Sequence, residues 1–206
     1  MKGKMDEGFI KFNFNWIRSA AAPVDDIMQI NHWRSRMYDL GLIGVDDNGI
    51  GFGNISIRTN DRTFLITGAA TGKLKRLDNC HYVLVTEYNF LENSLTCTGP
   101  IRASSESLTH ASIYECSPVT NAVIHVHNQD MWERLIDEVP TTSRHVSYGT
   151  PEMADEIKRL FDETAVSSEK ILAMGGHREG VISFGSTPEE AAKVLMDKFA
   201  GDTIFR

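Results

Sequence analysis

The stretch Ala122-Val123-Ile124-His125-Val126-His127-Asn128 places two histidines one residue apart in an apolar, β-branched run. Such a run favours a β-strand, and strand side chains alternate between two faces, so His125 and His127 project from the same face. Their Cα atoms then lie roughly 6.5 Å apart, at a rise of about 3.3 Å per residue. Two imidazoles at this spacing can bind one metal ion, with bonds of about 2.0–2.1 Å if the ion is zinc. The stretch therefore predicts a strand that carries two metal ligands.

Short apolar runs and segments of helical periodicity alternate along the rest of the chain. The runs predict strands at residues 54–58, 63–67, 82–86, 95–98, 170–174 and 181–184. Helices are expected at residues 23–40 and 105–115, after Asn128, from Pro151, and from the segment 186–189 to the C-terminal end. Strands interspersed with helices in this way predict an α/β fold in which helices cover a sheet.

The length of 206 residues fits one large domain, and no Pro/Gly/Ser-rich linker divides the chain. A composition of 41% hydrophobic and 24% charged residues is that of an ordinary globular protein. We expect residues 1–22 to form an N-terminal arm and residues 23–206 to form the domain.

The net charge of −7 argues against a nucleic acid as the partner. No window approaches the roughly 18 consecutive apolar residues that a membrane span needs, and the N-terminal residues do not have the pattern of a secretory signal. The three cysteines are widely spaced and form no CxxC pair, which favours free thiols in a reducing cytoplasm.

A third ligand is needed, because a catalytic zinc site typically has three protein ligands and one open position. His177 is the strongest choice: it lies between Gly175-Gly176 and Gly180, and these glycines permit a tight turn and a close approach of backbone to a ligand. Weaker choices are His32, His81, His110 and His145. The alternative is that the histidine pair belongs to an ordinary core, with its hydrogen bonds satisfied there.

Three polar segments can frame a pocket beside such a site: residues 51–56, 66–68 and 104–106. Ser104 and Ser105 precede a predicted helix, whose exposed N–H groups can hold an anion. Glu106 could then be a general acid/base, because metal-assisted proton abstraction needs a carboxylate near the metal. Each segment alone is equally typical of a helix cap or a turn.

The motifs also occur in a known order: GNIS at 53–56, TG at 67–68, SSE at 104–106, HVH at 125–127 and GGH at 175–177, with His110 and Tyr114 following SSE. In this order, over residues 27–198, the chain resembles the class II aldolase/adducin family. The resemblance implies a three-layer α/β/α sandwich with a central mixed or antiparallel sheet. It also implies a homotetramer with active sites between subunits.

For the site, the resemblance implies a divalent metal, generally zinc, on His125, His127 and His177, with Glu106 as the catalytic acid/base. The family's phosphate-binding positions correspond to Asn54, Thr67, Gly68, Ser104 and Ser105. The implied activity is that of a zinc-dependent lyase of carbohydrate metabolism. It would form or cleave a C–C bond in a small hydroxycarbonyl compound, such as a sugar phosphate, through a metal-stabilised enediolate.

Two alternatives stay open within the same family. One is a sugar-phosphate epimerase or dehydratase that uses the same site, and the other is a non-catalytic, adducin-like interaction module. The epimerases generally carry Asp where this chain has Glu106, which favours aldolase or dehydratase chemistry. Adducin-like domains lack the full metal set, so the three histidines together with Glu106 favour an enzyme. The sugar-phosphate aldolases place a tyrosine acid in the region of residues 127–145, whereas this chain has its nearest tyrosine at Tyr148.

Overall fold

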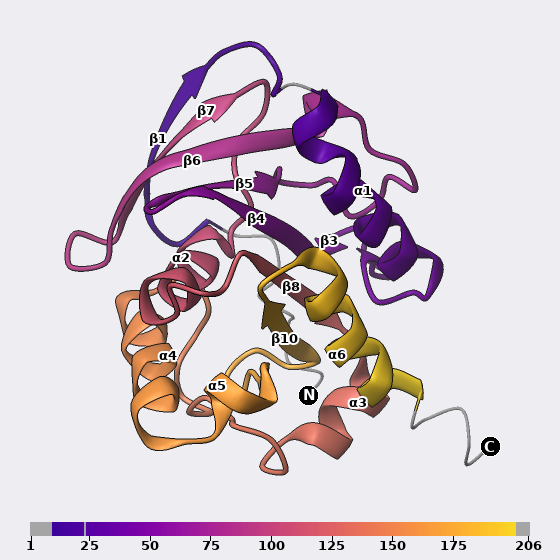
Figure 1. The fold of residues 1–206 in the computed structure, drawn as a ribbon, viewed down its shortest axis with the longest axis vertical. Coiled ribbons are helices and arrows are strands. Elements are labelled where there is room, and N and C mark those ends of the chain that lie inside the picture. The colour runs from indigo at the N-terminus through magenta and orange to yellow at the C-terminus, as the bar shows by residue number, and fades with distance from the viewer. Residues whose placement is uncertain (1–9, 23, 201–206) are drawn as a thin grey trace.

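A single eight-stranded sheet organises the computed structural model, which describes residues 10–22 and 24–200 (Figure 1). From edge to edge it consists of β1 (Asn13–Arg18), β7 (Ser94–Gly99), β6 (Tyr82–Asn89), β5 (Thr63–Thr67), β4 (Asn54–Asn60), β8 (Ala122–His127), β10 (Gly180–Gly185) and β9 (Ile171–Ala173). β1 runs parallel to β7, and all the other neighbours are antiparallel. The sheet is therefore mixed. A separate small hairpin joins β2 (Gly44–Val45) to β3 (Gly51–Phe52).

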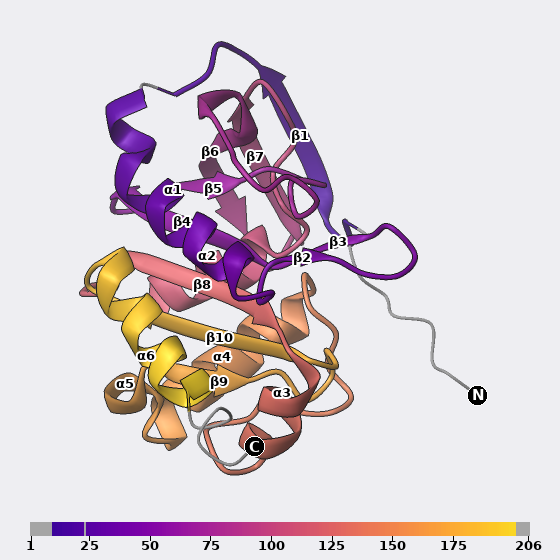
Figure 2. The ribbon, with the colours of Figure 1, turned by 90° about the vertical axis from the view of Figure 1, so that its right-hand side faces the viewer.

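Helices cover both faces of this sheet. Figures 1 and 2 show α1 (Val24–Asp39) and α6 (Pro188–Ala200) on one side, and α2 (Ser107–Cys116) and α4 (Pro151–Glu163) on the other. The shorter elements are α3 (Gln129–Leu135), α5 (Val166–Glu169) and a 3-10 turn, η1 (Asn79–His81). The α/β class and the three-layer arrangement expected from the sequence are confirmed.

Strand β8 shows how the alternation of side chains divides the core. Ala122, Ile124 and Val126 pack in the hydrophobic cluster under α1 and α6, whereas Val123 packs in the cluster under α2 and α4. Since alternate side chains of a strand share a face, His125 and His127 lie on the α2/α4 side with Val123. Burial of each large apolar side chain in these clusters contributes about 1.5–3 kcal/mol to folding, so the register of β8 is strongly specified.

The sequence-predicted elements are present, with shifted ends. The helix expected from residue 105 begins at Ser107, because Glu106 is its N-cap residue, with φ −91° and ψ 2°. The strand expected at 82–86 continues to Asn89. Strands β1, β2 and β3 and helix α5 were not expected, and β1 falls within the segment expected to be an arm. Pro23, expected in the first turn of α1, lies outside the described residues.

The structure also bears on two broader expectations from composition. None of the described helices is both long and apolar enough to cross a membrane. Cys80, Cys97 and Cys116 are free thiols, as their spacing predicts.

Candidate metal centre

Three buried histidines meet on the α2/α4 side of the sheet. His125 and His127 come from β8, and His177 comes from the turn between β9 and β10. One ring nitrogen of each lies within 4.8 Å of the other two, and the Nε2 atoms of His127 and His177 are 3.0 Å apart. Two ligands of a tetrahedral zinc ion with bonds of about 2.0–2.1 Å lie about 3.3 Å apart. The cluster therefore has the dimensions of a three-histidine metal site.

Gly180 creates the space for this cluster. It pairs with His127 across the β8–β10 ladder, so a side chain there would point into the histidines. A Cβ atom on Gly180 would lie 2.8 Å from Cδ2 of His177 and 3.2 Å from Nε2 of His125. The absence of a side chain at this position is thus a requirement of the site.

Gly175 and Gly176 bring His177 to the site by a close approach to the protein's own backbone. A Cβ atom added to Gly175 would lie 2.1 Å from the carbonyl oxygen of Thr142. One added to Gly176 would lie 2.0 Å from the carbonyl oxygen of Val146. The amide of Gly175 also donates to the Thr142 hydroxyl at 3.0 Å. The sequence suggested that these glycines let backbone approach a ligand, but the close approach is to residues 142–146.

The electrostatics of the cluster suit a cation. Burial, together with the neighbouring His127, His177 and His110, holds the pKa of His125 well below its usual value, so the ring is neutral at physiological pH. A neutral imidazole has a lone pair for a metal. The Nε2 atom of His125 is buried and has no hydrogen-bond partner among the described residues, which is the condition expected of a metal ligand.

Glu106 places a carboxylate directly against the histidines. The residue is fully buried, and its Oε1 atom lies 3.3 Å from Nε2 of His177 and 4.0 Å from Nδ1 of His125. Its position at the N-cap of α2 fixes the backbone from which the side chain extends. A buried carboxylate at this distance can accept or deliver a proton at a substrate bound to the same centre.

A small, polar pocket adjoins the cluster through Asn54. The side-chain amide nitrogen of Asn54 lies 3.5 Å from Nδ1 of His125. The pocket is lined by Gly51, Gly53, Asn54, residues 68–72, Ser104 and Ser105. The three polar segments expected to frame one site therefore do meet. Thr67 is not part of the lining, because its hydroxyl accepts a hydrogen bond from the amide of Ile55 at 3.2 Å.

His110 and Tyr114 hold α2 against β4 behind the site. The Ser56 hydroxyl lies 2.7 Å from Nδ1 of His110 and 2.7 Å from the Tyr114 hydroxyl. Burial lowers the pKa of His110 to about 3, so this ring is neutral. His110 follows Glu106 by one helical turn, and its amide donates to the Glu106 carbonyl at 3.0 Å. This network fixes the start of α2.

Three other histidines were weaker choices for the third ligand. Among the described residues, they lie apart from the cluster of His125, His127 and His177. His32 packs edge-on against Trp33, His81 belongs to the capping box of η1, and His145 is exposed.

Tyr148 lies at the site, although the sequence gave it no role. Its ring centre is 4.5 Å from that of His177, and the side chain is buried. The Lys11 ammonium lies over the same tyrosine ring, 4.0 Å from its centre. Residue 148 precedes the N-cap of α4, and no sequence pattern links that position to the turn at 175–177.

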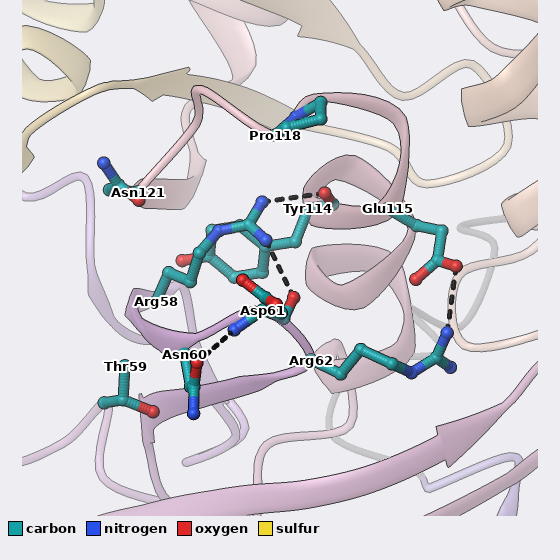
Figure 3. Close-up of a pocket in the computed structure, with 9 residues that line it drawn as sticks. All are labelled: Arg58, Thr59, Asn60, Asp61, Arg62, Tyr114, Glu115, Pro118 and Asn121. Atoms are coloured by element: carbon teal, nitrogen blue, oxygen red, sulfur yellow. Dashed lines mark hydrogen bonds and ion pairs between the residues drawn. The ribbon is translucent and has the colours of Figure 1, made fainter.

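A second surface pocket lies at the opposite ends of β4 and α2. Figure 3 shows Arg58 and Arg62 there, with Tyr114 and Glu115 from α2. The Arg58 guanidinium donates to the carbonyl oxygens of Tyr114, Ser117 and Thr120, and Arg62 pairs with Glu115 at 3.0 Å. These hydrogen bonds and this ion pair hold the C-terminal end of α2 against β4, so we assign the residues of this pocket a role in structure.

Comparison with known proteins agrees with this arrangement. The model of the family described as Class II Aldolase and Adducin N-terminal domain matches residues 44–197. No curated protein sequence matches the chain.

Three solved structures illustrate the shared fold. YgbL from Escherichia coli has a TM-score of 0.63 at 16% identity, with 88% of each chain covered. An L-fuculose 1-phosphate aldolase has a TM-score of 0.64 at 14% identity, covering 90% of this chain and 86% of its own. The sugar-phosphate aldolase from Thermotoga maritima has a TM-score of 0.61 at 15% identity, covering 88% of this chain and 97% of its own. At these identities the likeness is one of fold.

Proposed function

The chain belongs to the family of class II aldolases and adducin N-terminal domains, and from this membership we propose that it is a metal-dependent lyase of the aldolase type. Its substrate would be a small hydroxycarbonyl compound, a sugar phosphate above all, in which it forms or cleaves a C–C bond. One observation carries the proposal: a buried carboxylate, Glu106, lies 3.3 Å from His177 within a cluster of three buried histidines.

His125, His127 and His177 would hold the divalent cation, which we propose to be zinc or a related metal. When bound, such an ion supplies Lewis-acid stabilisation for negative charge that develops on substrate oxygen atoms. The neutral state of His125 and its buried Nε2 atom support this assignment. Three histidine ligands are also the set found in catalytic rather than closed structural sites.

Glu106 would move the proton. Its Oε1 atom would take the proton from the carbon next to the substrate carbonyl and return it in the reverse direction. The carboxylate extends from the start of a helix that Ser56, His110 and Tyr114 hold in place. A fixed carboxylate meets the substrate with little loss of conformational freedom, which favours catalysis.

The pocket beside Asn54 would bind the anionic group of the substrate. Ser104 and Ser105 offer hydroxyl donors, Asn54 offers its amide, and Gly68 permits a close approach of backbone. Thr67 would act through its hydrogen bond to the Ile55 amide, which holds the start of β4 next to the pocket. Anchoring a phosphate here holds the reacting carbon near Glu106, and such positioning can contribute several kcal/mol.

The test is a condensation assay with the purified protein, dihydroxyacetone phosphate and a panel of short aldehydes, with zinc or cobalt supplied. Formation of a new C–C bond supports the lyase. If no aldehyde reacts, pentulose phosphates distinguish the alternatives: a new isomer indicates an epimerase, and loss of water indicates a dehydratase. Absence of bound metal, before and after its addition, would instead indicate a non-catalytic module.

We also propose that the protein assembles as a homotetramer. Sedimentation velocity on the metal-loaded protein tests this directly, because a 23.0 kDa subunit gives well-separated monomer, dimer and tetramer species. A monomer at micromolar concentration would contradict the proposal.

A further inference from the structure

A buried arginine lies directly behind the loop that lines the polar pocket. Arg34, from α1, is only 1% exposed. Its Nη2 atom donates to the carbonyl oxygens of Thr71 at 2.9 Å and Gly72 at 3.3 Å, and its Nη1 atom donates to that of Lys75 at 3.0 Å. The guanidinium therefore holds three carbonyls of one short loop.

Among the described residues, no carboxylate compensates this charge. Within the described part of the chain Arg34 forms no ion pair, and its electrostatic neighbours are the tyrosines Tyr82 and Tyr38, the ring centre of Tyr38 being 4.9 Å away. Burial lowers the pKa of Arg34, yet a guanidinium stays protonated in proteins at neutral pH. A buried positive charge balanced only by carbonyl dipoles attracts an anion across the loop.

The same loop forms a wall of the pocket. Thr71 and Gly72, whose carbonyls bind Arg34, line it together with Asn54, Ser104 and Ser105. Since the C=O and N–H groups of a trans peptide point in opposite directions, the N–H groups of Gly72 and Lys73 turn away from the guanidinium. Arg34 thus holds these two N–H groups on the side of the loop opposite the guanidinium.

The loop is also held from its other side. A Cβ atom at Gly72 would lie 2.3 Å from the carbonyl oxygen of Gly44 and 2.9 Å from Cα of Gly51. The Thr71 hydroxyl donates to the Gly68 carbonyl at 2.8 Å. The backbone between residues 68 and 72 is therefore closely packed against the β2–β3 hairpin, which favours the orientation that Arg34 imposes.

We propose that Arg34 is a positioning residue for anion binding, which turns the amides of Gly72 and Lys73 toward the pocket and adds a positive charge behind them. The inference rests on the proposed function, because it assigns the pocket to an anionic group of the substrate. Arg34 thereby favours phosphorylated or otherwise anionic substrates over neutral ones without contacting them.

Arg58 offers a matched control. It too donates to several backbone carbonyls, those of Tyr114, Ser117 and Thr120, and it too is packed against a tyrosine ring (Figure 3). It lies four residues beyond Asn54 on β4, about 13 Å along the strand. Its replacement removes comparable hydrogen bonds without touching the pocket.

The experiment measures binding of inorganic phosphate to the metal-loaded, full-length protein by titration calorimetry at low salt. Arg34→Gln keeps a donor for the carbonyls but loses the charge, and it should weaken binding about tenfold or more, as expected for a unit charge acting across one peptide unit. Arg34→Lys keeps the charge and should bind phosphate more tightly than Arg34→Gln. Arg58→Gln should bind it like the wild type.

A second measurement needs no variant and covers the case in which Arg34→Gln does not fold. Phosphate should slow amide hydrogen exchange at Gly72 and Lys73 of the wild-type protein, and should leave exchange around Arg58 unchanged. Absence of this protection overturns the inference.

Three outcomes are distinguishable from failure of the proposed function. Equal phosphate affinity for wild type and Arg34→Gln, or equal loss in Arg58→Gln, overturns the role of Arg34 alone. Absence of phosphate binding in the wild type overturns it as well. In each case metal content and the condensation assay still decide separately whether the protein is a lyase.

Discussion

The Nε2 atoms of His127 and His177 lie 3.0 Å apart although 50 positions separate the two residues in the chain. One histidine is fixed by the pairing of β8 with β4 and β10, and the other by a glycine turn packed on residues 142–146. The centre therefore depends on two independent pieces of structure, and a change in either should be visible in metal binding.

Replacing any one of the three clustered histidines with alanine should remove about one bound ion per subunit, because a site with two remaining ligands binds metal far more weakly. Elemental analysis after dialysis measures this for His125→Ala, His127→Ala and His177→Ala. His145→Ala is the matched control, since His145 is exposed and should leave the metal content unchanged. Full metal content in His177→Ala would show that the third ligand is another group.

Glu106→Gln should sharply lower turnover without lowering the metal content of the metal-loaded protein. The amide has the shape of the carboxylate but cannot exchange a proton, and loss of a general acid/base typically lowers the rate by about 10²–10⁴-fold. The measurement compares kcat with metal content for the same preparation, on whichever substrate the condensation assay identifies. Turnover near the wild-type value would assign proton transfer to a different group, and Tyr148, beside His177, would be examined next.

Gly176→Ala should displace His177 and weaken metal binding. The new Cβ atom would lie 2.0 Å from the Val146 carbonyl oxygen, so the turn must move, and such overpacking typically costs about 1–3 kcal/mol. Metal affinity and the free energy of unfolding of the metal-free protein measure the two effects. Gly49→Asn is the control, because a Cβ atom there meets nothing within 4 Å and asparagine tolerates its positive φ. Unchanged metal affinity in Gly176→Ala would contradict the proposed dependence on this turn.

The contribution of Glu190 to stability should depend on pH. Its hydrogen bonds with the Lys170 ammonium, and then with Ser186, lower the pKa of this carboxyl to about 2, from an ordinary value of 4.5. Because the pKa in the folded state is the lower one, the stabilisation is fully present above about pH 4.5 and is lost as the pH falls toward 2. Glu190→Gln should therefore lower the free energy of unfolding by about 1 kcal/mol at pH 7, allowing for solvent screening, and by little near pH 2.

Urea unfolding of the metal-free protein at several pH values measures this difference, and Glu189→Gln, an exposed neighbour on α6, serves as its control. A constant difference between wild type and Glu190→Gln across the acid range would show that the ion pair contributes little.

Local pattern was enough to predict the central part of the site. The alternation around His125 and His127 places both rings on one face of a strand, and burial of Val123 on that same side follows from the same rule. The segments around Asn54, Ser104 and Glu106 were expected to frame a pocket, and they do meet. Their order along the chain identified the family that the comparisons then showed.

Other features depend on contacts between distant segments, which a single sequence does not display. β1 exists because Asn13–Arg18 pairs in parallel with β7, more than 70 residues later. Arg34 looks like an ordinary helix residue until the loop carrying Thr71 and Gly72 packs against it. In the sequence, the glycines before His177 suggest room for a ligand, whereas in the fold the backbone of residues 142–146 occupies that space.

The place of β8 in the sheet has a consequence for how the protein would bind and release a metal ion. β8 is bonded to β4 on one edge and to β10 on the other, and both its faces are covered, so His125 and His127 are held by the polypeptide itself. In small zinc domains the metal drives folding, and chelation unfolds them. Because strand pairing and two apolar clusters hold β8, we expect this protein to stay folded when a chelator removes a bound ion, and to bind a divalent ion again afterwards. The identity of that ion would then depend on supply as well as on the ligands.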